Sequence, residues 1–189
     1  DNTAIGSASL RTCTTGNRNV AIGTEALYDV SGPGGFDGQS EGSRNVGIGD
    51  SAGTDIGRGY LNTMVGQAAG PNTEHADGNT FVGVRAGWDN NRTNNTNDAN
   101  WNTYLGGKAG YSNREGEWNV ILGFGADFGT TIGERNVAVG AAPASNSVWD
   151  DGHEVLDGDD IVVIGYDPLA DRDHAIAIGA IAKARGTNA

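Results

Sequence analysis

The sequence predicts an all-β protein, a parallel β-solenoid or β-roll of about ten coils, and three observations carry this prediction. A short motif, Asn followed by three mostly apolar residues and Gly, recurs along the whole chain. The recurrence has a regular base period of about 17 residues, and self-similarity at a short fixed period is typical of stacked coils. Gly is abundant, with 32 of 189 residues, while Pro is scarce, with 4. This composition favours tight turns between short strands over helices, where Gly is unfavourable.

The copies of the motif align on the glycine that closes each one. The ten glycines are Gly6, Gly23, Gly49, Gly66, Gly83, Gly106, Gly123, Gly140, Gly165 and Gly179. Subtracting neighbouring numbers gives steps of 17, 26, 17, 17, 23, 17, 17, 25 and 14, so three steps exceed the base period, by 9, 6 and 8. We therefore predict one continuous array over residues 1–189, with insertions at about 29–41, 89–98 and 146–157.

The motif itself is expected to form a short strand. The residue before the glycine is always aliphatic, and the residue two positions earlier is Thr or a β-branched aliphatic. Side chains two apart share one face of a strand, so we expect these two positions to point into the coil. The position between them is variable and should point outward. In four coils this middle residue is large and apolar, and we predict that Met64, Phe81, Tyr104 and Ile121 form an oligomer interface. The alternative is that these four residues form a second wall of the coil interior.

The rest of the unit predicts two turns. Asn opens the motif in eight of the ten copies, and stacking would align these side chains into a ladder that bonds neighbouring backbone at a turn. A small residue, usually Ala, stands three positions after the motif glycine and is expected to lie in a second short strand packed inside the coil. Successive coils should lie about 4.8 Å apart, as neighbouring strands of a sheet do.

The runs "NVAIG" and "NTFVG", each followed by x-x-Ala, and the run "NVAVG" resemble the head repeats of trimeric autotransporter adhesins of the YadA type. Similar runs occur in the collars of phage tail fibres, and the resemblance extends through all ten motifs. It implies a left-handed parallel β-roll, three chains packed side by side, and an extracellular adhesive or receptor-binding role. Only the last step, from Gly165 to Gly179, has the coil length usual in that family, so the other coils must carry longer turns.

Charge and composition limit the classes of partner that the chain is expected to bind. The chain has 24 acidic and 12 basic residues, a net charge of −12, which argues against binding to nucleic acid or to anionic lipid. Cys13 is the only cysteine, so no internal disulfide can form. No apolar run approaches the length of a transmembrane helix, and the chain begins within the first motif, as a mature or excised segment would. We expect an extracellular protein, on a cell surface or on a virion fibre.

The insertions are the places where recognition is expected, because loops on a rigid scaffold carry it in many proteins. An aromatic ring beside Asp or Asn suits a sugar-binding loop, and the candidate ligand-binding residues are Phe36, Asp37, Trp88, Asp89, Asn90 and Trp149. The alternative is that the aromatic residues fold back onto the rod. Tyr28, Trp88, Tyr111 and Phe128 all follow a motif glycine by five positions and would then form one structural ladder.

The third insertion is acidic. Its candidate metal ligands are Asp150, Asp151, Glu154, Asp157, Asp159 and Asp160. Ca²⁺ is bound by clusters of carboxylate and carbonyl oxygens, so a calcium site is one interpretation, although the spacing fits neither of the common Ca²⁺ loops. A solvated acidic loop is the alternative, and no other cofactor is expected.

These observations predict an extracellular adhesin or receptor-binding fibre head that presents loops for multivalent attachment to a surface glycan or matrix protein. The alternative is a structural protomer of a head-to-tail extracellular filament. We expect a homo-oligomer, a trimer first. We do not expect an enzyme, because His75, His153 and His174 stand alone without metal-ligand spacing.

Overall fold

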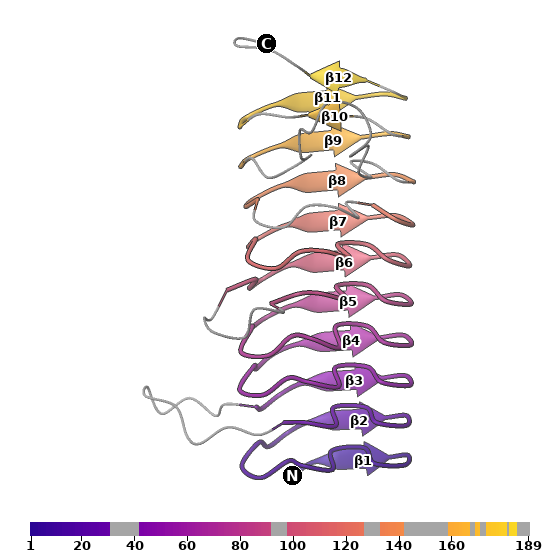
Figure 1. Cartoon of the computed structure of the whole chain (residues 1–189), viewed down its shortest axis with the longest axis vertical. Coiled ribbons are helices and arrows are strands. Elements are labelled where there is room, and N and C mark those ends of the chain that lie inside the picture. Colours follow the sequence, from indigo (N-terminus) through magenta and orange to yellow (C-terminus); the bar gives the residue numbers. More distant parts are fainter. Residues whose placement is uncertain are drawn as a thin grey trace.

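The computed structural model is a rod of stacked coils (Figure 1). It describes residues 1–30, 42–91, 98–126, 133–141, 159–166, 169–170, 173–180 and 182–184. Within these ranges the chain is all-β, without a helix. The strands are β1 (Thr3–Ile5), β2 (Val20–Ile22), β3 (Val46–Ile48), β4 (Thr63–Val65), β5 (Thr80–Val82), β6 (Thr103–Leu105), β7 (Val120–Leu122), β8 (Val137–Val139), β9 (Val162–Ile164), β10 (Leu169–Ala170), β11 (Ile176–Ile178) and β12 (Lys183–Ala184).

One parallel sheet runs the length of the rod. Its ten strands follow the chain order β1 to β9 and then β11, while β10 and β12 form a separate parallel pair. Equivalent motif positions pair across every step; for example, Met64 of β4 lies opposite Phe81 of β5. The sheet is open, and each strand of it is the central part of one motif. The predicted β-solenoid with one strand per motif is therefore confirmed.

The strand faces are the reverse of those predicted. The middle residue of each strand points into the coil, and Met64, Phe81, Tyr104 and Ile121 have no exposed surface in the single chain. The prediction that these four residues form an oligomer interface is therefore wrong. They are the core of the rod, and the first and third residues of each strand point outward, half-buried or exposed.

A return segment follows each motif glycine and crosses back over the strands (Figure 1). The small residue expected in a second strand is buried, as at Ala52, but it lies in a turn. Ser51 and Gly53 on either side have φ of 54° and 59°, a left-handed conformation that no strand contains. The Ala52 N–H donates to the carbonyl of Gly49 at 3.4 Å. The prediction of a second strand is wrong because the chain turns tightly at this point.

The core is filled by compensation between the strand and the return segment. Where the middle strand residue is large, the facing residue of the return segment is Gly. A Cβ on Gly53 would lie 2.7 Å from Sδ of Met64, and one on Gly87 would lie 2.7 Å from Cε2 of Phe81. Where the return segment supplies Leu27 instead, a Cβ on Gly47 of β3 would lie 2.7 Å from Cγ of Leu27. Along the rod, the summed volume of the middle strand residue and the facing residue of the return segment is preserved more than the residue types are, as close packing requires.

The predicted asparagine ladder is confirmed. It comprises Asn2, Asn19, Asn45, Asn62, Asn79, Asn102, Asn119 and Asn136. Each side-chain oxygen accepts the backbone N–H of the residue at the same place in the next coil, at 2.8 to 3.0 Å. In most rungs Nδ2 also donates to a backbone carbonyl further along the chain, such as Asn45 to Gly59 at 2.8 Å. The ladder satisfies the buried backbone where the chain turns into each strand.

Candidate functional site

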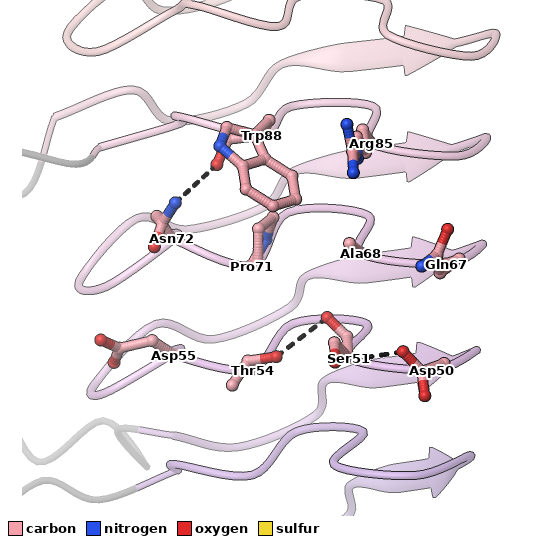
Figure 2. A pocket seen from close by; sticks show the side chains of 10 residues that line it. All are labelled: Asp50, Ser51, Thr54, Asp55, Gln67, Ala68, Pro71, Asn72, Arg85 and Trp88. Atoms are coloured by element: carbon pink, nitrogen blue, oxygen red, sulfur yellow. Dashed lines mark hydrogen bonds between the residues drawn. The ribbon is translucent and has the colours of Figure 1, made fainter.

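A groove lies on the return segments of three successive coils (Figure 2). It has a volume of about 470 Å³, and small-molecule sites commonly measure roughly 300 to 1,000 Å³. The residues that line it are Asp50, Ser51, Thr54, Asp55, Gln67, Ala68, Pro71, Asn72, Arg85 and Trp88. These residues lie on the return segments, which cross in front of the strands in Figure 2, so the groove opens on the side of the rod opposite the outward surface of the sheet.

The groove exists because a column of outward side chains shortens. The position five places after the motif glycine holds Tyr28, Thr54, Pro71, Trp88 and Tyr111 in successive coils. The rings of Trp88 and Tyr111 stack at 5.9 Å with 4° between their planes. Thr54 and Pro71 are too small to continue this stack down to Tyr28. The hollow is therefore bounded by the Trp88 indole at one end of the column and has Pro71 and Thr54 on its floor.

Polar groups line the two sides of the groove. Asp50 and Gln67 lie toward the motif-glycine end of their return segments, and Asp55 and Asn72 lie toward the other end (Figure 2). Asn72 donates from Nδ2 to the carbonyl of Trp88 at 3.0 Å, which fixes the orientation of the amide. At the Trp88 end, the guanidinium of Arg85 lies 5.1 Å from the ring centroid, a cation–π distance.

Asp55 has the most perturbed carboxyl of the groove. Partial burial raises its pKa from 3.8 to about 6, with further increases from the negative charges of Glu74 and Asp29. The carboxylate form is thus disfavoured in the folded chain. Between pH 4 and 6 the folded state binds a proton that the unfolded state does not bind, so this group adds stability as the pH falls through that window.

The Asp55→Asn variant is expected to be more stable than the wild type at pH 7 and equal to it near pH 4. Since the carboxyl is only half-buried, solvent screening reduces the expected gain to about 1 kcal/mol. The check is thermal unfolding of both proteins over a pH series, which cancels the titration of the other acids. Parallel curves for the two proteins would contradict the raised pKa.

The structure separates the sequence-predicted site residues. Trp88 lines the groove and also belongs to the expected aromatic ladder through its stack on Tyr111. The prediction that Asp89 and Asn90 lie in an exposed loop is wrong: they belong to the regular coil, 7% and 0% exposed. Asn90 donates to the Ala99 carbonyl at 3.0 Å and accepts from Asn113 at 3.1 Å. Phe36, Asp37 and Trp149 lie outside the described residues.

The candidate metal ligands are only partly described. Asp150, Asp151, Glu154 and Asp157 lie outside the described residues. Asp159 and Asp160 both engage Arg135: Oδ2 of Asp159 is 3.3 Å from Nη2 and Oδ1 of Asp160 is 2.7 Å from Nε. Within the part of the chain that the structure describes, no group of three or more His, Cys, Asp and Glu side chains is arranged to hold a metal ion.

Sequence reasoning missed most residues of the groove. Asp50, Asp55, Asn72 and Arg85 lie in regular coils, not in insertions, so a search confined to insertions passes over them. One signal was present in the sequence. The column that holds Tyr28, Trp88 and Tyr111 changes to Thr54 and Pro71 between the aromatic residues, and such a change predicts a hollow on the surface of a stacked rod.

A second surface is the outward side of the sheet, here called the strand face. It consists of the first and third residues of strands β1 to β9 and β11, which are all Thr, Val, Ile or Leu. Leu105 is 50% exposed on it. Its borders are apolar in the middle of the rod, where Trp101, Trp118 and Phe124 are 47%, 50% and 69% exposed. Large contiguous apolar surfaces are rare on monomers, which makes the strand face a second candidate site.

Comparison of the chain with protein-family models, with curated proteins and with solved structures finds no match. Among the described residues, no helix is present that could cross a membrane.

Proposed function

We propose that this protein is the head of an extracellular attachment fibre, an adhesin or receptor-binding rod that packs side by side with identical chains and presents its opposite side to surface glycans. The observation that carries the proposal is the strand face. It is uncharged along its whole length, and several of its apolar side chains are at least half exposed in the single chain. The homo-oligomer is expected to be a trimer.

The size of the strand face supports a second copy as its occupant. The nine spacings between ten strands, at about 4.8 Å each, and a width of about five residues at about 3.3 Å each give a flat area on the order of 700 Å². A stable protein interface buries about 800 Å² on each partner. The strand face and its apolar border are thus large enough to hold two copies together.

The two borders of the strand face carry bulky apolar side chains in the middle of the rod. Trp101 and Trp118 precede the ladder asparagines on one border, and Gly107 and Phe124 follow the motif glycines of the same coils on the other. When one border meets the other border of the next parallel copy, Trp101 faces Gly107 and the exposed rings of Trp118 and Phe124 meet. A contact between two different borders is heterologous and forms a ring where the rotation between copies closes, and a trimer is such a ring.

The groove supports binding more than catalysis. Its two carboxylates, Asp50 and Asp55, lie at opposite ends of one return segment (Figure 2). A glycosidase holds its two carboxyl groups close across a single bond. A binding rod that displays several equal sites gains strength from multivalency, because attachment at one site raises the effective concentration at the next.

The purified protein is expected to have the mass of three chains over a wide concentration range, measured by light scattering after size exclusion. The Leu105→Glu/Val120→Glu variant should have the mass of one chain, since charges placed on the strand face would be buried unpaired in the trimer. Its thermal unfolding should remain cooperative, because both side chains point outward. The Thr54→Glu variant, in the middle of a return segment, is the matched control and should stay trimeric.

A wild-type protein that is monomeric at every concentration would overturn the oligomeric head. A mass that grows with concentration, with rods visible by electron microscopy, would also overturn it and support the end-to-end filament. Loss of the trimer in the Thr54→Glu control as well would show that charge alone, and not the strand face, controls assembly.

A further inference from the structure

We propose that the groove between Asp50 and Trp88 is a subsite for one neutral saccharide unit of a surface glycan. The inference deepens the proposed function and rests on it in one respect, that the partner is a glycan. It places recognition on the regular coils, away from the insertions.

The floor of the groove suits the apolar face of a pyranose ring. Ala68 is 6% exposed and Pro71 is buried, so both present carbon atoms at the bottom of the hollow. The indole of Trp88 closes the upper end, held in place by its stack on Tyr111. A sugar ring has one face of C–H groups that packs on aromatic and proline carbons. Binding of a sugar to Trp88 should cost little side-chain entropy, because the indole ring is already fixed in the stack.

The sides of the groove suit hydroxyl groups. Carboxylates and side-chain amides can bond two neighbouring hydroxyls at once, and Asp50 and Gln67 lie at one end of the groove with Asp55 and Asn72 at the other (Figure 2). The Asn72 oxygen is available as an acceptor because its Nδ2 already donates to the Trp88 carbonyl at 3.0 Å. Arg85 adds a fork of N–H donors at the Trp88 end. Donors and acceptors on both sides of an apolar floor fit a polyhydroxylated ring better than a lipid or a hydrophobic peptide.

The charges of the groove select a neutral saccharide. Asp50 and Asp55 give it two carboxylates against the one guanidinium of Arg85, and the whole chain has a net charge of −12. A polysulfated or phosphorylated ligand would be repelled by this surface. Uncharged hydroxyls carry no such penalty, and they can donate to the carboxylates while accepting from the guanidinium.

The position of the groove agrees with the proposed assembly. The lining residues lie on the return segments, which cross in front of the strands in Figure 2. Packing through the strand face would therefore leave the part of the groove over Thr54, Pro71 and Trp88 open to solvent. A single shallow subsite binds weakly, while several on one rigid rod can gain roughly two to four orders of magnitude in avidity.

The test is binding of the full chain to a panel of immobilised neutral oligosaccharides built from glucose, galactose, mannose and their N-acetylated forms. The best probe is then titrated in solution by saturation-transfer NMR. We expect at least one probe to bind the wild type. Thr54→Tyr should weaken that probe at least tenfold, because it restores in the groove the aromatic ring that Tyr28 and Tyr111 place in their own coils.

A second groove variant and a matched control complete the test. Arg85→Gln should weaken binding at least threefold without filling the hollow, and it tests the groove even if Thr54→Tyr fails to fold. Lys108→Gln is the matched control, since Lys108 occupies the same place in the next coil and lies outside the groove lining; it should bind as the wild type does. Absence of binding to the whole panel, or equal binding by the wild type and the groove variants, would overturn the subsite.

The outcomes separate this inference from the assembly. A monomeric protein that still binds a saccharide in solution, and loses it in Thr54→Tyr, upholds the groove and overturns the trimeric head. A trimer that binds no neutral saccharide does the reverse. Binding that survives every groove variant would place recognition elsewhere on the rod and overturn the subsite alone.

Discussion

Replacing Gly106 with alanine is expected to lower the unfolding free energy by more than about 4 kcal/mol, an exceptionally large loss for one substitution. Gly106 has a φ of +137°, in a region that only glycine adopts without strain. A Cβ there would lie 2.6 Å from the carbonyl carbon of Gly123 in the next coil, and nearer still to its oxygen. Both obstacles are backbone, so no side-chain rotation relieves them.

The matched control is the neighbouring glycine. A Cβ on Gly107 would lie 3.2 Å from Cδ2 of Phe124, an exposed side chain that can move. Gly107→Ala should therefore change the unfolding free energy by less than about 1 kcal/mol. Chemical denaturation of the two variants, followed by circular dichroism, gives the comparison. If the two variants lost the same unfolding free energy, the close stacking of the motif glycines would be refuted.

The same column of glycines explains why so much of the fold could be predicted. A motif that recurs at a regular step places the same residue type at the same point of each coil. Gly106 must be glycine because Gly123 lies directly against it, and the ladder asparagines must be asparagine because each bonds the next. Contacts between equal positions are visible in the sequence as repetition. The strands, their pairing and the ladder were therefore predictable.

The direction of the side chains was not predictable from the same repetition. A period of two separates two faces of a strand but does not say which is inside. Uniform aliphatic positions suggest the core, yet the variable position is the buried one. It can vary because the return segment compensates for it, with Leu27 against Gly47 and with Gly53 against Met64. This compensation links positions that do not share a column, so it is hidden until the path of the return segment is known.

The groove was hidden for a related reason. Its residues come from three coils, and Asp50 and Asn72 are brought to its two sides only by the turns of the return segment. The left-handed conformations of Ser51 and Ala68, with φ of 54° and 50°, set these turns. Neither serine nor alanine is a residue type that favours the left-handed conformation. Sequence alone could align the column of Thr54 and Pro71, but it could not place the polar residues around it.

The second large loss of unfolding free energy is expected in the asparagine ladder, and its size should differ between rungs. Asn62→Ala is expected to cost roughly 2 to 5 kcal/mol, because it leaves two buried backbone groups without partners. The Asn62 oxygen accepts the Asn79 N–H at 2.9 Å, and its Nδ2 donates to the Ala76 carbonyl at 2.8 Å. The side chain has no exposed surface, so water cannot replace these bonds without opening the coil.

Asn79→Ala is the matched variant in the next rung and should cost less, roughly 1 to 3 kcal/mol. The Asn79 oxygen accepts the Asn102 N–H at 2.9 Å, but its buried Nδ2 has no hydrogen-bond partner among the residues that the structure describes. The acceptor at the equivalent place is the carbonyl of Ala99, which takes a hydrogen bond from Asn90 at 3.0 Å. Removing Asn79 therefore orphans one backbone group where removing Asn62 orphans two.

The difference between the two rungs is the measurement that matters. Denaturant unfolding of both alanine variants should give a larger loss for Asn62→Ala by about 1 to 2 kcal/mol. In both variants a fully buried asparagine becomes alanine, so burial and strand propensity cancel in the comparison. A loss that is equal in the two variants would mean that the Asn79 amide is bonded after all. The cost of each rung would then follow from its place in the ladder alone, and not from the number of backbone groups that it satisfies.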